Sequence, residues 1–437
     1  KDYPYPELKK NCAIIKMEFS GICGTDKHSF EGFFDQKGGR PIPLPVIQGH
    51  ENVGIIEEIN GELLDHNGTK LSVGDRVVPA PNISCGKCFA CRNNRPYYYC
   101  DCKLDYGNNI GAGEEPHIFG GWSEYLYILP GSHLFKFPET LESRFGTFIE
   151  PMSVTGCLDK ARQWSSEWEP FRSGDTVVIL GTGPIGLFHL IKANLMGAGK
   201  LISVDPYSFR TSIASEFGAT DLIISKNREE IKDNIKKITD NIGADLVVDC
   251  TGVSEGFTIA LELIREGGMV LEVGIFSNSH EIPINPHSHI LEKSARVIGV
   301  GGDDISQYYP SIRLLEKNIE KLPWHKIISH ELFDRTGGYR EGFEGSQDHD
   351  LALRMSEITE PQHIPAVAYH WRIHSDTQSR KQNLPTVPAT LKIEKQTNPF
   401  LRCEEKSVID AAILREGKKL ADSIEVFATI RRWKDSF

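Results

Sequence analysis

The sequence predicts an α/β fold in which the middle of the chain forms a parallel, doubly wound sheet. Strand-like and helix-like segments alternate from about residue 176 to about residue 300, which is the order expected of βαβ units. A glycine-rich turn, GTGPIG, lies between the first of these strands and the first helix. The chain has 437 residues, too many for one ordinary hydrophobic core, so about two or three domains are expected.

The alternation begins with the β-branched run Thr176–Leu180, a helical pattern after the glycine turn, and a second strand at Leu201–Val204. Further strands are expected at ATDLIIS, ADLVVDCTG, MVLEVGI and ARVIGVGG, and helices at REEIKDNIKKITDNIG and SEGFTIALELIREGG. Parallel strands bring their carboxyl ends to one edge of the sheet. The glycine-rich ends DCTG, VGI and VGG are therefore expected to face a cofactor crevice.

The glycine turn has the spacing of a dinucleotide-binding fingerprint, because an acid, Asp205, ends the second strand about 20 residues later. Its carboxylate can accept hydrogen bonds from a ribose and repel a 2′-phosphate. NAD is therefore expected as cofactor, while Arg210 nearby keeps NADP as the alternative. The candidate cofactor-binding residues in these segments are Gly181, Gly183, Pro184, Ile185, Gly186, Asp205, Arg210, Thr251, Val273, Gly274 and Val300.

Composition is that of a globular protein, with 39% hydrophobic and 25% charged residues. No run of about 18 apolar residues is present, so no transmembrane helix is expected. The first residues, KDYPYPELKKNC, lack the apolar region of a secretory signal. A net charge of -11 argues against nucleic acid or a membrane surface as partner, since both require a basic footprint. A cytoplasmic protein is expected.

Five of the ten cysteines fall within CGKCFACRNNRPYYYCDC, while the other five are scattered, which argues against a disulfide framework. Cys85, Cys88 and Cys91 are separated by two residues each, and Cys100 follows after a polar loop. Thiolates at such spacing can converge on one ion at about 2.3 Å and close a tetrahedral zinc site. An iron–sulfur cluster is the main competitor, and Cys102 is left over.

Three other motifs supply a second candidate metal site. GICGTDKH contains Cys23, GHENVG contains His50, and FIEPMSVTGC contains Glu150. Each residue alone has an ordinary explanation: a small buried cysteine, a loop histidine and a helix-entry acid. Together they form a mixed three-ligand set, which is typical of a catalytic zinc that keeps one position for water or substrate.

The sequence resembles the zinc-containing medium-chain alcohol and polyol dehydrogenases. The matching stretches are GICGTDKH, GHENVG, GDRVV, CGKCFAC, GGWSEY, EPMSVTG and GTGPIG, in family order from about residue 10 to about residue 333. The resemblance implies a GroES-like, β-rich catalytic domain before a Rossmann domain. Glu150 stands where many alcohol dehydrogenases have cysteine. In this respect the chain is more similar to the sorbitol and threonine dehydrogenase branch of the family.

The resemblance also implies the roles of residues. Catalytic zinc would bind Cys23, His50 and Glu150, with Glu51 as a neighbouring acid or exchangeable ligand. Structural zinc would bind the thiols 85, 88, 91 and 100, with Cys102 as alternative fourth ligand because the gap before Cys100 is one residue longer than usual. Two zinc ions per chain follow. Zinc would polarise the substrate hydroxyl. The remaining implied roles are a proton relay through Thr25 and His28, and a contact with the nicotinamide from Thr155.

The implied organisation is a catalytic domain at 1–155, a Rossmann NAD-binding domain at 156–300 and a return segment at 301–335. A small-molecule alcohol substrate and a homodimer or homotetramer are expected. The atypical C-terminal extension, 336–437, resembles the end of family-2 glycosyltransferase domains in GGYREGFEGSQDHDLALRMSEITEPQHIPAVAYHWRIHSDT. The corresponding positions are Asp348, Asp350, Trp371 and Arg372.

The sugar-nucleotide half of such a transferase is absent, so this extension is expected to be an inactive remnant. A linker is expected at 381–400, followed by a terminal helix with an apolar face. The leading prediction is an alcohol or polyol dehydrogenase using zinc and NAD. The rival functions are an idle zinc- and dinucleotide-binding scaffold and a bifunctional dehydrogenase–glycosyltransferase.

Overall fold

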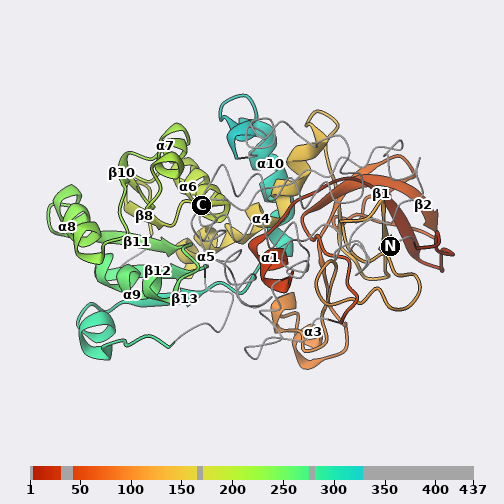
Figure 1. Ribbon diagram of the computed structural model, residues 1–437, viewed down its shortest axis with the longest axis horizontal. Coiled ribbons are helices and arrows are strands. Elements are labelled where there is room, and N and C mark those ends of the chain that lie inside the picture. The colour runs from red at the N-terminus through yellow and green to blue at the C-terminus, as the bar shows by residue number, and fades with distance from the viewer. Residues whose placement is uncertain (1–2, 31–42, 165–170, 275–280, 328–437) are drawn as a thin grey trace, which may run out of the picture. The chain divides into compact units, whose positions relative to one another are not determined.

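The computed structural model describes residues 3–30, 43–164, 171–274 and 281–327 (Figure 1). Residues Tyr5–Ser329 belong to one compact unit, which contains every element described below. The glycosyltransferase-like segment, the expected linker and the expected terminal helix lie outside the described residues. No helix in the described part is long and apolar enough to cross a membrane.

The N-terminal part of the unit is built on a five-stranded antiparallel sheet with the order β6-β1-β2-β3-β7. The two longest strands pair from Cys12↔Asn60 to Ser20↔Asn52, with irregularities at two points in the register. The side chains of Ile14 and Ile15 are both fully buried. The strands are β1 Cys12–Ser20, β2 Asn52–Asn60, β3 Arg76–Pro79, β6 Tyr125–Ile128 and β7 Leu134–Lys136.

The cysteine-rich loop lies between two short strands, β4 Asn82–Ile83 and β5 Leu104–Asp105, which pair with each other. Within it are a short helix, α3 Phe89–Arg92, and a 3-10 turn, η1 Tyr97–Tyr99. The pairing of β4 with β5 closes the base of the loop. The segment from residue 84 to residue 103 therefore forms a lobe of its own.

The middle of the chain forms a six-stranded parallel sheet with the order β10-β9-β8-β11-β12-β13. Its central strands are buried on both faces, as their β-branched composition predicts; Val177, Val178 and Ile179 are fully buried. The strands are β8 Thr176–Leu180, β9 Lys200–Val204, β10 Asp221–Ile223, β11 Ala244–Asp249, β12 Ile264–Glu272 and β13 Arg296–Gly299. The predicted α/β fold class with a doubly wound parallel sheet is confirmed.

Helices α6 Pro184–Leu195, α7 Ser208–Glu216, α8 Arg228–Ile238 and α9 Ser254–Leu263 follow successive strands (Figure 1). Helix α8 shows why the sequence folds this way locally. The Asn227 side chain accepts the backbone N–H of Glu230 at 3.1 Å, and acidic residues occupy the first turn. Ile231 and Ile235, which are one turn apart, are buried on the side of α8 that faces the sheet. The N-cap, the acidic residues at the positive end of the helix dipole and the apolar stripe thus all favour a helix at this position.

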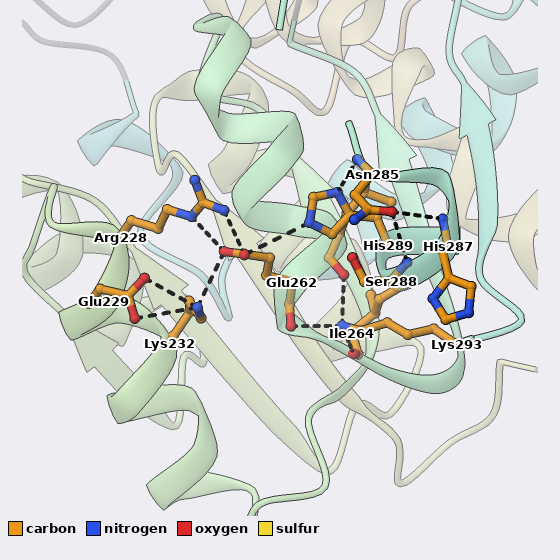
Figure 2. Close-up of polar contacts among 11 residues, drawn as sticks. Arg228, Glu229, Lys232, Glu262, Ile264, Asn285, His287, Ser288, His289 and Lys293 are labelled. Carbon is orange, nitrogen blue, oxygen red and sulfur yellow. Dashed lines mark hydrogen bonds and ion pairs between the residues drawn. The ribbon is translucent and has the colours of Figure 1, made fainter. Parts of the chain in front are cut away.

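The sequence prediction was wrong at the end of α9, where a helix was expected to continue through Gly268. The helix ends at Leu263, and β12 begins at Ile264. Gly267 adopts a φ of 71°, which a helix does not allow. Lys293 Nζ donates to the carbonyls of residues 261, 262 and 264 at 2.8–2.9 Å (Figure 2). It therefore satisfies the carbonyls that the helix end leaves without partners.

Glu262 ties three surface elements together at this end of the sheet (Figure 2). Its carboxylate accepts two bonds of 2.6 Å from the Arg228 guanidinium and lies 3.7 Å from Lys232 Nζ. His289, in the turn η3 His287–Leu291, approaches it at 3.9 Å. Helices α8 and α9 and the η3 turn are thereby held together before the chain enters β13.

After β13 the chain returns to the elements of the first sheet. The 3-10 turn η4 Ile305–Gln307 leads into α10 Tyr308–Asn318, which packs against α4 Ile149–Val154. The Tyr308 ring stacks on Phe135 of β7 with centroids 4.6 Å apart, and the Tyr309 hydroxyl donates to Asp65. A final 3-10 turn, η5 Trp324–Lys326, buries Trp324.

Candidate metal centres and dinucleotide crevice

Four thiols converge in the cysteine-rich lobe. The sulfurs of Cys85, Cys88, Cys91 and Cys100 all lie within 4.8 Å of one another. Sγ of Cys91 is 3.9 Å from that of Cys85 and 3.5 Å from that of Cys88. A zinc ion with four sulfurs at about 2.3 Å requires sulfur–sulfur edges of about 3.8 Å. The residues therefore fit zinc, and exposed Cys102 lies outside the group.

Local backbone geometry favours thiolates at this site. Backbone N–H groups of Cys91 and Asp101 lower the pKa of Cys88 to about 6, and those of Lys87 and Cys88 lower the pKa of Cys85. Burial raises the pKa of Cys100 to about 12. An ion at the centre would supply the positive charge that keeps the buried fourth sulfur ionised.

A second cluster joins Cys23, His50 and Glu51, whose ligand atoms also lie within 4.8 Å of one another. Cys23 directly precedes the short helix α1 Gly24–Phe30, and His50 and Glu51 directly precede β2. The backbone at Gly21 passes so close to Glu51 that a Cβ there would lie 2.0 Å from Glu51 Oε2. A side chain at position 21 would displace the acid, so glycine is required at this position.

Asp26 organises the second cluster. Its buried carboxylate accepts the backbone N–H of Cys23 at 2.8 Å and that of Gly49 at 3.4 Å, and Oδ1 lies 3.3 Å from His50 Nδ1. Burial alone would lower the pKa of His50, but the charge and hydrogen bond of Asp26 outweigh it and hold that pKa above its usual value. The sequence analysis assigned Asp26 no role. Its only signal is an acid three residues after Cys23.

Glu150 lies in the first turn of α4, beside this cluster but not in the set of mutually close ligand atoms. Burial raises the pKa of Glu150, and the negative charge of Asp303 adds to this effect. Burial and the neighbouring Cys23 likewise raise the pKa of Glu51. Two carboxyls, one thiol and one imidazole thus crowd a buried space. A divalent cation would relieve the repulsion, so the donor set fits zinc.

The residues predicted to relay a proton both lie on α1. Thr25 Oγ1 is 3.6 Å from Cys23 Sγ. His28 follows one turn later on the same helix and is half-buried. The structure thus places Thr25 beside the predicted ligands, with His28 on the same element.

A buried acid connects the cysteine-rich lobe to the return segment. Asp303, which is 3% exposed, accepts a bond of 2.5 Å from Asn82 Nδ2 and one of 2.8 Å from the Tyr308 hydroxyl. The Tyr97 hydroxyl, from the cysteine-rich lobe, also donates to it. The sequence analysis missed this network, because Asn82 and Tyr97 lie more than 200 residues from Asp303 and no motif links them to it.

The glycine fingerprint forms the turn between β8 and α6. Gly181 has a φ of 86°, and a Cβ there would lie 2.9 Å from backbone atoms of Cys250 and Thr251. Gly183 is the N-cap of α6, with Pro184 as its first residue. A Cβ on Gly186 would lie 2.0 Å from the Gly181 carbonyl. The motif therefore gives the tight turn and the exposed helix N-terminus that a pyrophosphate requires.

Asp205 directly follows β9, beside this turn. Its carboxylate accepts backbone N–H groups of Thr182 at 2.9 Å and Tyr207 at 3.0 Å, and Oδ2 lies 3.4 Å from an Arg210 nitrogen. The guanidinium of Arg210 also lies over the rings of Tyr207 and Phe209, at 5.1 and 5.7 Å from their centroids. Arg210 thus partly neutralises the acid that favours NAD.

The other predicted crevice residues extend the sheet ladder at its carboxyl edge. The backbone N–H of Val273 donates to the backbone carbonyl of Asp249 at 3.0 Å. That of Val300 donates to the backbone carbonyl of Glu272 at 2.9 Å. Thr155 lies elsewhere, at the C-cap of α4, where its hydroxyl donates to the Met152 carbonyl at 2.6 Å. It lines a small cavity with side chains of α4, α5 Gly156–Trp164, α6 and α10.

Comparisons with known proteins agree with this architecture. Residues 9–139 match the family model of the alcohol dehydrogenase GroES-like domain, and residues 184–317 match that of the zinc-binding dehydrogenase. An L-idonate 5-dehydrogenase from Vitis vinifera is 31% identical over 358 residues, covering 81% of this chain and 89% of that protein. The chain belongs to the zinc-binding dehydrogenase family.

Further relatives of this zinc-binding dehydrogenase include a curated protein and two solved structures. An L-threonine 3-dehydrogenase from a Marinomonas species is 28% identical, covering 78% of this chain and 91% of that protein. The structure of an alcohol dehydrogenase from Thermotoga maritima aligns with a TM-score of 0.69 at 28% identity, covering 77% of this chain and 93% of that one. A zinc-binding dehydrogenase from Sinorhizobium meliloti bound to NADP aligns with a TM-score of 0.62 at 28% identity, covering 74% and 86%.

The C-terminal extension of the dehydrogenase matches a different family. Residues 367–437 match the model of the hydroxyacylglutathione hydrolase C-terminus. This match overlaps the glycosyltransferase-like segment only in part, and both lie outside the described residues. The glycosyltransferase resemblance stays a prediction.

Proposed function

We propose that the chain oxidises a secondary alcohol or polyol, an amino alcohol or a sugar, and passes the hydride to NAD. As a zinc-binding dehydrogenase it is an oxidoreductase that uses zinc and a nicotinamide dinucleotide and acts on a small-molecule alcohol. The buried cluster of Cys23, His50 and Glu51 carries the proposal, because such a mixed set holds zinc with one position left for substrate. Relatives named L-threonine 3-dehydrogenase and L-idonate 5-dehydrogenase support a secondary alcohol, since both names place the oxidised carbon inside a chain.

The residues of the second cluster would have the following roles in the reaction. When bound, zinc would polarise the substrate hydroxyl and the dinucleotide would accept the hydride. Cys23 and His50 would hold the ion, with Glu51 or Glu150 as third ligand. Asp26 fixes the ring of His50 by its contact with Nδ1. The hydroxyl of Thr25 would accept the proton of the substrate hydroxyl while passing its own proton on toward the imidazole of His28.

NAD is the proposed cofactor because Asp205 lies at the end of the second strand of the dinucleotide fold. The paired Arg210 supports NADP as a second cofactor, and a zinc-binding dehydrogenase of the same fold binds NADP. The substitution Asp205→Ser should therefore shift the ratio of kcat/KM values toward NADP. A wild type that already prefers NADP would show that Arg210 dominates.

The proposed assembly is a homodimer or homotetramer in the cytoplasm. β13 is the edge strand of the parallel sheet, and exposed apolar side chains lie on and before it. Val297, Ile290 and Leu291 are 42%, 40% and 71% exposed, and such an edge can pair with a second copy. A cysteine cluster with metal-ligand spacing, and no disulfide framework in the sequence, supports the cytoplasm. The proposed domain bounds remain 1–155, 156–300, 301–335 and 336–437.

A combined measurement tests the proposed function. Elemental analysis of the purified full chain should give two zinc ions, and a screen of polyols, amino alcohols and sugars should reveal NADH formation. Cys23→Ser should lose one zinc and all turnover, whereas Cys102→Ser, at an exposed thiol outside both clusters, should lose neither. A Cys23→Ser variant that keeps full zinc content and turnover would rule out the proposed catalytic site.

A further inference from the structure

A buried histidine lies directly behind the glycine fingerprint. His189 is on α6, one turn after Ile185 of the motif, and its side chain is fully buried. Both ring nitrogens have a polar partner. Nδ1 lies 2.7 Å from the Ile185 carbonyl oxygen, and Nε2 lies 3.2 Å from Cys157 Sγ. The sequence analysis assigned no role to His189 or to Cys157.

These two contacts determine which ring nitrogen carries the hydrogen. A carbonyl oxygen only accepts hydrogen bonds, so Nδ1 of His189 must be the donor to Ile185. Burial lowers the pKa of His189 to about 4, so the ring is neutral at neutral pH and Nε2 keeps a lone pair. Burial also raises the pKa of Cys157 to about 12, so its thiol keeps its hydrogen. The Cys157 thiol therefore donates to Nε2.

The histidine connects two helices that border the predicted crevice. Cys157 is the second residue of α5, two residues after Thr155, for which a contact with the nicotinamide is predicted. Ile185 is in the first turn of α6, the helix whose N-terminus would bind the pyrophosphate. Thr155 and side chains of α6 also line the same small cavity. The spacing between α5 and α6 therefore sets the distance between the two ends of the predicted dinucleotide site.

A third element, the end of β11, also reaches the ring of His189. Cys250 directly follows β11, and its Sγ lies 4.0 Å from Nδ1 of the ring. The backbone N–H of Cys250 donates to the carbonyl of Leu180, the last residue of β8, at 2.8 Å. A Cβ on Gly181 would lie 2.9 Å from the carbonyl carbon of Cys250. The imidazole thus lies where α5, α6 and the end of β11 meet, behind the fingerprint turn.

The same two helices also share an ion pair, which differs from the thiol–imidazole bond in its exposure. Lys192 Nζ of α6 lies 2.5 Å from Asp159 Oδ2 of α5, and the Asp159 side chain is 41% exposed. Water can replace the partner of an exposed carboxylate, so such a pair fixes the helices only weakly. Loss of the Cys157 thiol would instead leave the buried Nε2 of His189 without its donor. A buried acceptor without a donor is costly, so the thiol–imidazole bond holds the spacing more strongly.

We propose that His189 is a positioning residue for the dinucleotide, because its Nδ1–H tautomer holds the first turn of α6 and, through Cys157, the start of α5. The inference rests on the proposed function in that the crevice is taken as the dinucleotide site. His189 acts through the two helices and not by contact with the cofactor. Without the bridge α5 can move relative to α6, and part of the binding free energy is then spent on restoring their spacing. Cofactor affinity therefore falls when the bridge is removed.

The test measures the dissociation constant of NADH by fluorescence with the full zinc-loaded chain. Cys157→Ala removes the donor to Nε2, and we expect the dissociation constant to rise by about tenfold. Cys157→Ser keeps a donor of similar size and should bind NADH as the wild type does. Cys12→Ala, which removes a buried thiol from β1 of the antiparallel sheet, is the matched control and should also bind normally. Equal affinities in Cys157→Ala and Cys157→Ser, or equal weakening in Cys12→Ala, would overturn the positioning role.

A second measurement detects the tautomer itself. Nitrogen NMR of the full chain with labelled histidine should contain a neutral Nδ1–H imidazole, assigned to His189 by its loss in His189→Gln. An Nε2–H ring or a doubly protonated ring at this position at neutral pH would overturn the inference. If the wild type binds neither NADH nor NADPH, the proposed function fails together with the positioning role. Normal NADH binding in the wild type that Cys157→Ala leaves unchanged removes the positioning role alone.

Discussion

The two candidate metal centres of this chain are specified in different ways. The four thiols at residues 85–100 come from one loop, closed by the pairing of β4 with β5. The cluster of Cys23, His50 and Glu51 joins two segments separated by more than twenty residues. Its ligands converge because Asp26 binds both segments and because Gly21 leaves room for Glu51. The first centre depends on local spacing and the second on tertiary contacts.

This difference predicts different roles for the two proposed ions. A closed set of four thiols leaves no position for a substrate, so its ion can only hold the loop. The mixed set has a crowd of acids with raised pKa values, which is typical of a functional site rather than a structural one. Substitutions should therefore separate the two centres by their effects on turnover and on unfolding.

The largest expected effect is on turnover. Cys23→Ser removes a ligand of the mixed cluster, and we expect kcat to fall by at least about 1000-fold, or about 4 kcal/mol in the barrier. The melting temperature should stay close to that of the wild type, because the cluster is held together by Asp26 and not by the thiol. Steady-state kinetics and thermal unfolding of the same preparation measure both. Equal loss of folding in this variant and in a thiol-lobe variant would contradict the division of roles.

The next effect is on folding stability. Cys100→Ser removes the buried fourth thiol of the cysteine-rich lobe, and the free energy of unfolding should fall by about 4 kcal/mol. Denaturant unfolding with a zinc assay measures the loss. Cys102→Ser is the matched control, since that thiol is exposed and lies outside the group. Greater loss in the control would identify Cys102 as the fourth ligand.

A smaller effect is expected for Asp26→Asn, which keeps the shape but removes the charge beside His50 Nδ1. Zinc affinity at the mixed cluster should fall by about 10–100-fold, as for other groups that orient a ligand. Competition with a chelator, followed by counting zinc per chain, measures this change. The cysteine-rich lobe should keep its zinc at chelator concentrations that empty the other site. Equal zinc loss from both sites would show that Asp26 acts on the whole fold.

The smallest effect is expected for Tyr97→Phe, which removes one of the hydroxyls that donate a hydrogen bond to Asp303. The free energy of unfolding should fall by about 1–2 kcal/mol, without loss of zinc from either site. Tyr99→Phe, at an exposed ring in the same turn, is the control and should behave as the wild type. A loss of zinc in Tyr97→Phe alone would mean that the hydroxyl supports the lobe itself.

The sequence predicted those features that depend on neighbouring residues. The alternation of strands and helices and the glycine turn are local patterns, and the structure has them where they were expected. The four-thiol spacing is also local, and the structure brings those thiols together. The boundary between α9 and β12 was wrong, because Lys293, about 30 residues further on, decides where the helix ends. The roles of Asp26 and Asp303 were not found, because they depend on contacts that no spacing encodes.

The hydroxyls that meet at Asp303 have a consequence for how the native state opens. Tyr97 from the cysteine-rich lobe and Tyr308 from the start of α10 bond to the two oxygens of one buried carboxylate. If either segment detached alone, one oxygen of the buried Asp303 carboxylate would lose its hydrogen-bond donor. Their amide protons should therefore exchange with solvent in a single subglobal opening, with one shared free energy. The cysteine-rich lobe and the first turn of α10, distant in sequence, then form one cooperative unit of the fold.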